Sequence, residues 1–373
     1  MKKRILFITQ DLGRTGSEMV LWHLLQHLDP DKYEMHVFCL STGALYEALP
    51  AYIGKSVMYK HSPDMWKRAF RRILKKLKVN ALDYQLSHIQ KRFKADVWFV
   101  NTIVIPEVYE VAKKHEVKIA TYIHELLYAF SFISATSMQK VISYSDVCIG
   151  CSEEVCNRIT EMGHENVKLQ HSFVDVNLIK PDLDRVAILR NELGFVSTDF
   201  VWVVSGKTTY MKGLDYIIPI LEHFKDQPVK ILWLGSVKKS GLLFYVQQVA
   251  RLKYPGKLVF AGAQSTDYYN YLAAANGLLL LSKEESFSLV LVEAAKLGLP
   301  VVSFDLGIAS QFLRSDIGMG SVVKSRNIED FVLQMRAVQD NSNLETEEIK
   351  REALVYSVQH QIPKFEKLIA ELF

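Results

Sequence analysis

The stretch GLLLLSKEESFSLVLVEAAKLGLPVVSFD, residues 277–305, decides the fold class of this chain. Residues 278–281 are four leucines, a run typical of a strand that is buried on both faces. A polar turn follows, and Ser288 begins a predicted helix that ends at Gly298, where a left-handed cap fits. Residues 301–304 form a second buried strand. This order of strand, loop, helix and strand is one βαβ unit of a parallel sheet and predicts an α/β protein.

Two acids in this unit are candidate site residues. Glu285 lies in the loop, and Glu293 lies eight residues later, inside the predicted helix. The backbone amides of Phe287, Ser288 and Leu289 begin that helix at the carboxyl end of a strand, where open α/β sheets bind ligands. Such a helix start favours phosphate. An acid beside it can accept hydrogen bonds from hydroxyls, and a sugar nucleotide offers both groups.

The alternative is that Glu285 is a solvated loop acid and Glu293 a cap or surface residue. The apolar neighbours of Glu293 argue against this, because they place it near a stripe that faces the sheet, where an unpartnered charge is costly. Glu293 is therefore expected to have a hydrogen-bonding partner.

The spacing of Glu285 and Glu293, followed by AAKLGLPVV at residues 294–302, resembles the signature of family 4 of the retaining glycosyltransferases. The resemblance covers nearly the whole chain. It implies the GT-B fold, in which two doubly wound Rossmann-like domains face each other across a cleft. We expect an acceptor-binding domain over residues 1–176, a nucleotide-sugar-binding domain over 177–355, and a C-terminal helix, 356–373, that packs back on the first domain.

The composition agrees with a chain of two globular domains. The chain has 373 residues, of which 49% are hydrophobic and 23% charged, and no apolar run approaches the length of a membrane span. The charged start and the short apolar run at residues 1–8 predict a first strand and no signal peptide. Cys148 and Cys151 have the spacing of a metal or redox pair, but neither a second pair nor a histidine cluster accompanies them. We therefore interpret the four cysteines as core thiols in a reducing, cytoplasmic compartment.

Two candidate site residues fall in the first domain. The loop DLGRTGSE, residues 11–18, is expected to open a helix, and the amides near Gly16 are candidates for a phosphate contact. A tight turn with Ser17 as the helix cap is the alternative. His124 ends a predicted strand, where site residues collect. In the family that the chain resembles, a histidine in this place faces the donor sugar. The apolar residues 126–135 line an acceptor channel or belong to the core.

A loop at the start of the second domain carries two lysines, Lys207 and Lys212. The sequence Gly206-Lys207-Thr208 lacks the upstream glycine of a P-loop, since Val201 stands in its place. The loop is more similar to the glycine–arginine and lysine–glycine loop of the family, in which two cations hold the pyrophosphate. Lys207 stands where arginine is usual, and a point charge replaces a planar fork there. The alternative is a pair of solvated loop charges.

The segment MWKRAFRRILKKLK, residues 65–78, predicts an amphipathic helix with a strongly basic face. Residues 60–94 contain eleven Lys or Arg against two Asp. The basic density beside a tryptophan favours a helix that lies on anionic lipid over an ordinary solvated helix. The expected membrane-facing residues are Trp66, Lys67, Arg68, Phe70, Arg71, Arg72, Lys75 and Lys76.

The sequence therefore predicts a retaining glycosyltransferase that moves a sugar from a nucleotide-sugar donor to a hydroxyl, with a saccharide or lipid-linked acceptor. The predicted catalytic residues are His124, Glu285 and Lys212. Neither a metal nor another cofactor is expected. An epimerase of the same fold, a catalytically silent subunit that binds nucleotide or membrane, and a nucleic-acid binder built on the basic helix are the alternatives. The acceptor suggested by the membrane helix belongs to surface polysaccharide or glycolipid synthesis.

Overall fold

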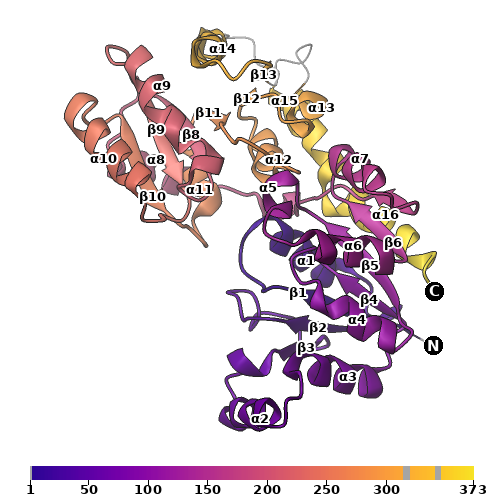
Figure 1. Cartoon of the computed structure of the whole chain (residues 1–373). Helices are drawn as coiled ribbons and strands as arrows, with labels where there is room; N and C mark the ends of the chain where they lie inside the picture. Colours follow the sequence, from indigo (N-terminus) through magenta and orange to yellow (C-terminus); the bar gives the residue numbers. More distant parts are fainter. Residues whose placement is uncertain (1, 314–319, 341–345) are drawn as a thin grey trace. The chain divides into compact units, whose positions relative to one another are not determined.

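The computed structural model describes residues 2–313, 320–340 and 346–373, which divide into two compact units (Figure 1). Unit 1 comprises Met1–Val174 with Val358–Phe373, and unit 2 comprises Asp175–Ser357. Each unit is a parallel sheet with its own helices. Which substrate each unit binds stays a prediction.

Unit 1 contains a seven-stranded parallel sheet in the order β3-β2-β1-β4-β5-β6-β7. Reversal of the strand order beside β1 is the topology of doubly wound, Rossmann-like sheets. The strands are β1 (Lys3–Thr9), β2 (Tyr33–Cys39), β3 (Gly54–Val57), β4 (Val97–Val100), β5 (Lys118–Ile123), β6 (Val147–Gly150) and β7 (Val167–Leu169).

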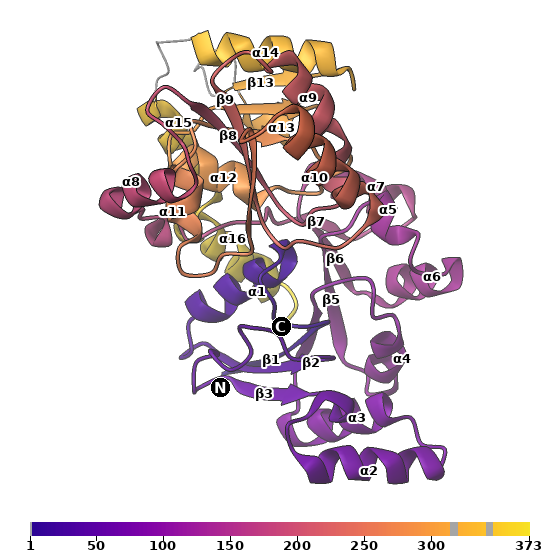
Figure 2. The same ribbon diagram turned by 90° about the vertical axis from the view of Figure 1, so that its left-hand side faces the viewer.

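The connections of unit 1 are mostly helical. The α-helices are α1 (Gly16–His27), α2 (Met65–Lys76), α3 (Ala81–Phe93), α4 (Glu107–Lys114), α5 (Leu127–Phe130), α6 (Ala135–Tyr144), α7 (Glu153–Glu161) and α16 (Val358–Ala370). Two neighbouring helices, α2 and α3, lie beyond strand β3 in both ribbon views (Figure 2). One 3₁₀ turn, η1 (Tyr59–His61), precedes α2, and the other, η2 (Val176–Leu178), begins unit 2.

Unit 2 repeats the same topology with six parallel strands in the order β10-β9-β8-β11-β12-β13. Its reversal point lies between β8 and β11, where a doubly wound sheet binds its ligand. The strands are β8 (Phe200–Ser205), β9 (Val229–Leu234), β10 (Leu258–Gly262), β11 (Gly277–Leu280), β12 (Val301–Phe304) and β13 (Gly320–Val323).

The helices of unit 2 follow its strands in turn. They are α8 (Leu183–Glu192), α9 (Ile217–His223), α10 (Gly241–Lys253), α11 (Tyr268–Ala273), α12 (Leu289–Lys296), α13 (Ile308–Phe312), α14 (Ile328–Asp340) and α15 (Thr346–Ala353). Besides η2, the described part of unit 2 has the 3₁₀ turns η3 (Tyr210–Lys212), η4 (Leu214–Tyr216) and η6 (Leu354–Tyr356).

The βαβ unit predicted from residues 277–305 is present as β11, α12 and β12. All four residues of each strand are buried, as expected for central strands of a parallel sheet. Gly298 has a φ of +73° just after the helix, which is the left-handed conformation that glycine adopts most readily. The predicted α/β fold class of two doubly wound domains is confirmed.

Helix α16 belongs to unit 1 although it follows unit 2 in the sequence. The ring of Phe365 lies 5.3 Å from that of Phe99 on β4, between ring centroids. Gln170 Nε2 donates a hydrogen bond to Gln361 Oε1 at 2.9 Å. Both Phe365 and Gln361 are buried, so this helix completes the core of the first unit.

Three local details complete the fold. Strand β3 ends at Val57, and Tyr59 lies in a 3₁₀ turn. Residues 126–135, expected to line a channel or to belong to the core, are mixed: Leu126 is buried, whereas Leu127 and Phe132 are 54% and 68% exposed. Asp182 caps helix α8 by accepting hydrogen bonds from the amides of Asp184 and Arg185.

The four cysteines are free thiols, and three of them, Cys39, Cys148 and Cys151, are buried. Within the described ranges, no helix has both the length and the hydropathy that a membrane-spanning segment requires.

Candidate functional site

The loops that follow β8 and β11 lie at the carboxyl edge of the unit 2 sheet and are joined by an ion pair. Lys212 Nζ contacts Glu285 Oε1, and Ser282 Oγ donates a hydrogen bond to the same carboxylate oxygen at 2.6 Å. The Glu285 side chain is 10% exposed and that of Lys212 is 33% exposed. Two predicted site residues, 73 positions apart, are therefore in direct contact.

Two glycines shape the first of these loops. Gly213 has a φ of +78°, and a Cβ at this position would lie 2.3 Å from the carbonyl oxygen of Leu281. Gly206 has a φ of +147° and lies against the aliphatic part of the Lys212 side chain. Only glycine fits either position without strain, so the backbone turns back and directs Lys212 toward Glu285. Lys207, the other predicted cation, is exposed.

A second ion pair fastens the same two loops. Lys283 Nζ lies 2.8 Å from Asp215 Oδ2 and 3.2 Å from the centroid of the Tyr216 ring. The Lys283 amide donates to the carbonyl oxygen of Met211 at 2.8 Å. These bonds fix the residues on either side of Lys212 relative to the loop that carries Glu285.

Arg326, from the segment between β13 and α14, binds the backbone of the second loop, the one that carries Glu285. Its two terminal nitrogens donate to the carbonyl oxygens of Ser282 and Lys283 at 2.7 and 2.8 Å. Its guanidinium lies 5.0 Å from the ring centroid of Phe304. The planar fork of arginine suits such a paired contact, which a lysine cannot reproduce. Sequence reasoning missed Arg326, because its partners are backbone atoms 44 and 43 residues away.

Glu293 has the partners that its apolar surroundings require. Tyr268 donates its hydroxyl to Glu293 Oε2 at 2.8 Å, and Tyr269 donates to Oε1 at 3.4 Å. The Tyr268 hydroxyl also lies 3.1 Å from Ser205 Oγ at the end of β8. Burial raises the pKa of Glu293 to about 7, and the two tyrosine hydroxyls lower it in part. The prediction of a partner is confirmed, whereas the tyrosines themselves were not foreseen.

The start of helix α12 lies next to this cluster in the sequence. Ser288 is its N-cap residue and is buried, and its side chain makes no capping hydrogen bond. The Phe287 ring packs at 5.4 Å from that of Tyr356. Leu289 is the first helical residue. That these three amides bind an anion remains a prediction.

In unit 1, His124 belongs to a hydrogen-bonded chain at the carboxyl ends of β4 and β5. His124 Nε2 lies 3.2 Å from Asn101 Oδ1, and Asn101 Nδ2 donates to the carbonyl oxygen of Ser17 at 3.1 Å. The amide nitrogen of Asn101 must donate to a carbonyl, so its oxygen faces His124 and the imidazole carries its proton on Nε2. Burial lowers the pKa of His124 to about 3, which keeps the ring neutral.

The neighbouring acid, Glu125, is tied to the same strand ends. The Thr102 hydroxyl donates to Glu125 Oε1, and the His124 amide donates to Oε2 at 2.9 Å. Burial raises the pKa of Glu125, and these hydrogen bonds lower it in part. Asn101 and Thr102 directly follow a buried strand, which is the signal by which sequence reasoning could have found them.

Gly16 is the first residue of α1, and a Cβ there would meet nothing within 4 Å. The helix cap is Thr15, whose amide bonds to Glu18 Oε2 at 2.8 Å in a capping box, so the alternative with Ser17 as cap was wrong. The glycine that this loop needs is Gly43, where a Cβ would lie 2.2 Å from the carbonyl oxygen of Leu12. A phosphate contact near Gly16 remains a prediction.

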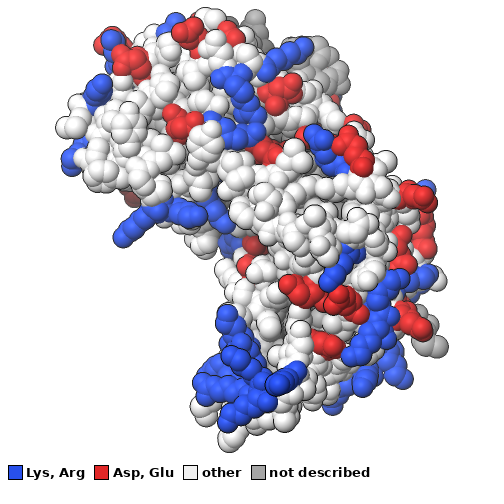
Figure 3. All heavy atoms as spheres, in the orientation of Figure 1, with Lys and Arg blue, Asp and Glu red and all other residues white. Residues whose placement is uncertain are grey.

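Helix α2 exposes most of its surface, and among its residues only Leu74 is buried. Trp66 and Ile73 are 78% and 52% exposed, whereas the Phe70 ring contacts Tyr59 and Tyr84. Figure 3 shows Lys and Arg side chains gathered over this helix. Other basic residues expected to face a membrane, Lys67, Arg68, Arg72, Lys75 and Lys76, are also exposed.

Comparison with solved structures identifies the fold. The chain is similar in fold to Anabaena HepE, solved in complex with UDP and glucose, with a TM-score of 0.83, 18% identity and coverage of 99% of this chain and 100% of that one. It is also similar to WaaG, described as a glycosyltransferase involved in lipopolysaccharide biosynthesis, with a TM-score of 0.73, 14% identity and coverage of 98% and 99%. The fold is that of the GT-B glycosyltransferases.

A family model matches most of unit 2. Residues 186–355 match the model described as glycosyl transferases group 1. The resemblance to family 4 enzymes is thereby confirmed, while the retaining stereochemistry stays a prediction.

Curated relatives match a part of the chain. One is the N-acetyl-alpha-D-glucosaminyl L-malate synthase of Bacillus anthracis, 26% identical over 44% of this chain and 43% of its own length. Another is the alpha-galactosylglucosyldiacylglycerol synthase of Streptococcus pneumoniae, 28% identical over 36% of each chain. The chain thus covers less than half the length of these relatives.

Proposed function

We propose that this protein is a retaining glycosyltransferase that moves a sugar from a nucleotide-sugar donor to a hydroxyl group. The observation that carries the proposal is the contact of Lys212 with Glu285 at the carboxyl edge of the unit 2 sheet, beside the start of α12. A cation for a pyrophosphate and an acid for sugar hydroxyls lie together at the place where doubly wound sheets bind nucleotides. The match of residues 186–355 to the group 1 glycosyl transferases supports it.

The leaving group of such a reaction is a nucleoside diphosphate, whose growing negative charge must be stabilised. Lys212 and Lys207 supply positive charge, and the first amides of α12 point their dipoles the same way. The ion pair of Lys212 with Glu285 is exchangeable, because a diphosphate competes for the ammonium group. Its arrival leaves the Glu285 carboxylate to accept hydrogen bonds from the donor sugar.

Glu293 is proposed to accept hydrogen bonds from the ribose hydroxyls. Tyr268 and Tyr269 hold its two oxygens in place and leave each with remaining acceptor capacity. In its ionised form the carboxylate is the stronger acceptor.

His124 is proposed to contact the donor sugar as a neutral imidazole held by Asn101. The departing phosphate takes the proton of the acceptor hydroxyl in a front-face reaction. These groups stabilise the leaving charge with amides and ammonium groups, so we propose that the reaction needs no metal.

We further propose that the enzyme works at an anionic membrane surface through α2, with a lipid-linked or surface-saccharide acceptor on the cytoplasmic side. Exposed Trp66 and Ile73 stand among the basic residues of that helix. This combination is typical of a helix that lies in a lipid interface.

Metal-free calorimetric titration with UDP, GDP and ADP tests the donor site. We expect one of them, first of all UDP, to bind, and Glu293→Ala to weaken that binding. Turnover of the matching nucleotide sugars with and without a hydroxyl acceptor then separates the activities. Epimerised sugar formed without acceptor identifies an epimerase, and nucleotide binding without any turnover identifies a silent subunit. Absence of nucleotide binding overturns the donor site.

A further inference from the structure

A surface hollow of about 360 Å³ lies where helix α2 passes into α3. Both helices belong to unit 1, and the hollow is formed by side chains of α2, the short link after it and the start of α3. Three of its lining side chains are cationic. They are Arg71, Lys75 and Lys78, and Met58, Val79, Asn80 and Ala81 also line the hollow.

These three cations have no acidic partner among residues 2–313, 320–340 and 346–373. Within the described part of the chain, none of them forms an ion pair. Two acids on the adjoining elements are engaged elsewhere. Asp64 accepts from the Trp66 amide at the start of α2, and Asp83 binds Lys114 at 3.3 Å and Ser87 at 3.0 Å. A concentration of like charge costs free energy unless an anion joins it.

The start of α3 does not provide the anion site by itself. Asn80 Oδ1 already accepts hydrogen bonds from the amides of Leu82 and Asp83, at 2.9 and 3.3 Å. These amides are therefore satisfied within the chain. The side chains of the three cations remain as the groups that can bind an anion here.

Lys78 stands in a backbone conformation that suits glycine better. Its φ is +57°, and the Val79 amide closes the end of α2 by bonding to the carbonyl oxygen of Leu74 at 2.9 Å. A side chain in the left-handed region costs about 1 kcal/mol relative to glycine. Glycine can therefore replace Lys78 with the helix end preserved, so this substitution removes one cation from the hollow without disturbing the backbone.

Exposed apolar side chains accompany the hollow on the same elements. Val79 lines it and is 41% exposed. Ile73 and Leu77 are 52% and 67% exposed and project from the other flank of α2, because each lies two positions from a lining lysine. A soluble anion needs no exposed apolar side chains on the helix that binds it, whereas a lipid headgroup is accompanied by acyl chains that such side chains can contact.

We infer that the hollow between α2 and α3 binds the phosphate of a lipid headgroup, and that a phosphomonoester is preferred over a phosphodiester. A phosphomonoester carries up to two negative charges and three terminal oxygens, which match three cations better than the single charge of a diester. This inference rests on the membrane-surface part of the proposed function and adds a defined headgroup site to it.

The test is co-sedimentation of the full-length protein with vesicles of phosphatidylcholine that contain phosphatidic acid or phosphatidylglycerol. The two vesicle preparations are adjusted to equal surface charge by their zeta potential. We expect binding to phosphatidic acid to be tighter by about tenfold, the equivalent of one additional charge-assisted hydrogen bond. Purely electrostatic attraction would give equal binding.

Two triple variants separate the hollow from the general charge of the helix. Arg71→Gln, Lys75→Gln and Lys78→Gly remove its cations, and Lys67→Gln, Arg72→Gln and Lys76→Gln remove three charges of α2 outside it. We expect the first variant to lose the preference for phosphatidic acid. The second should bind both lipids more weakly and keep the preference. Lys78→Gly alone, which favours the helix end, should reduce the preference with a melting temperature no lower than that of the wild type.

Each other result counts against the inference in a distinct way. Equal binding of the wild type to both lipids overturns the headgroup site and leaves the membrane proposal standing. Absence of binding to any vesicle overturns the membrane proposal as well. Equal losses in the two triple variants identify a diffuse charge effect. Competition by millimolar inorganic phosphate that releases the protein from both vesicles identifies a soluble-phosphate site.

Discussion

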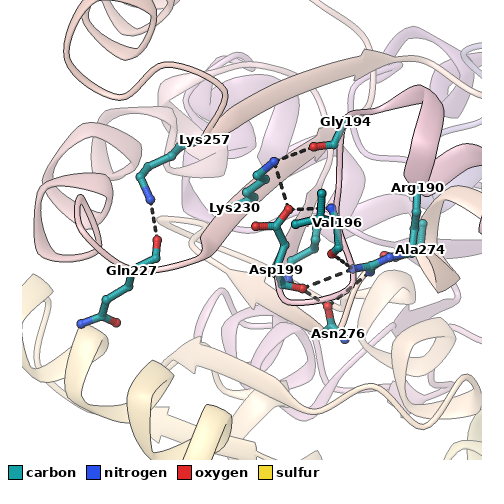
Figure 4. A network of polar contacts seen from close by, with 10 residues as sticks. Arg190, Gly194, Val196, Asp199, Gln227, Lys230, Lys257, Ala274 and Asn276 are labelled. Carbon is teal, nitrogen blue, oxygen red and sulfur yellow. Dashed lines mark hydrogen bonds and ion pairs between the residues drawn. The ribbon is translucent and has the colours of Figure 1, made fainter.

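The two edges of the unit 2 sheet both carry ion pairs, but they use them differently. At the amino edge, Asp199 pairs with Lys230 at 3.0 Å, and their side chains are only 6% and 19% exposed (Figure 4). Arg190 donates to the carbonyl oxygens of Ala274 and Asp199, at 2.6 and 3.2 Å. Each charged group here also has backbone partners, so the network fixes the starts of neighbouring strands relative to one another.

At the carboxyl edge, the ammonium group of Lys212 has Glu285 as its recorded partner, and its side chain is a third exposed. A ligand can replace one partner in such a contact at little cost, whereas it cannot enter the amino-edge network. The comparison shows two uses of ion pairs. Charged side chains that also bind backbone groups hold the strands of the sheet together, whereas a partly exposed ammonium group with one acidic partner remains available to a ligand.

The largest effect on activity is expected from Lys212→Met. Loss of one preorganised positive group at a developing anion should lower kcat/KM by about 10²–10³-fold. The melting temperature should stay within a few degrees, since the side chain is partly exposed. Steady-state kinetics and thermal denaturation measure the two quantities. A large loss of stability with retained activity would place Lys212 among the structural ion pairs.

The corresponding substitution at the amino edge is Lys230→Met, which removes the lysine of the ion pair there. It leaves Asp199 buried without its cation and should cost about 3 kcal/mol, a shift in Tm of roughly 6–12 °C for a unit of this size. Below the transition temperature, kcat should be unchanged. If activity fell and stability did not, the assignment of the two edges would be reversed.

The pH dependence of nucleotide binding should follow Glu293, whose pKa is raised to about 7 by burial. Ribose hydroxyls bind the ionised form better, so affinity should rise about tenfold as pH increases from 6 to 8. Glu293→Gln should flatten this rise and leave only the titration of the nucleotide phosphate. Calorimetry across this range measures it, and an equally steep rise in the variant would exclude Glu293.

Glu285→Gln should separate binding from transfer. The change removes a negative charge beside Lys212, so affinity for the free nucleoside diphosphate should increase about fivefold, whereas kcat should decrease. The matched control is Glu284→Gln, which removes a charge from the adjacent residue. Weaker diphosphate binding in Glu285→Gln would show that the ion pair itself builds the site.

The smallest expected effect belongs to Arg326, which positions the Glu285 loop through Ser282 and Lys283. Arg326→Leu should raise KM for the donor about threefold, the effect of one or two exposed hydrogen bonds, and change kcat little. Arg326→Lys should restore only part of the affinity. An unchanged KM in both variants would show that Lys283 alone holds the loop.

The fold could be predicted from the sequence because its signal is local. Runs such as the four leucines before Ser282, with a turn and a helix start after them, identify each βαβ unit by themselves. The contact of Lys212 with Glu285 was within reach for the same reason, since both follow strands whose carboxyl ends share one edge. The cap at Thr15 was missed, because the nearby Ser17 has a similar capping propensity.

The supporting residues could not be predicted, because they act on distant partners. Arg326 binds backbone carbonyl groups, which carry no side-chain signal, and Tyr268 meets Glu293 only after α11 and α12 have packed. Asn101 connects Ser17 to His124, which lie 107 residues apart. Such contacts depend on tertiary packing and are visible only in three dimensions.

The place of α16 in unit 1 also determines the order in which the two units can complete their folding during synthesis. Residues 358–373 follow the whole of unit 2, yet their helix fills the core of unit 1 beside Phe99. When they leave the ribosome, unit 2 is already complete, whereas unit 1 still lacks a core element. The domain that is translated first therefore finishes folding last, and until then its apolar surface around Phe99 lacks the cover of α16.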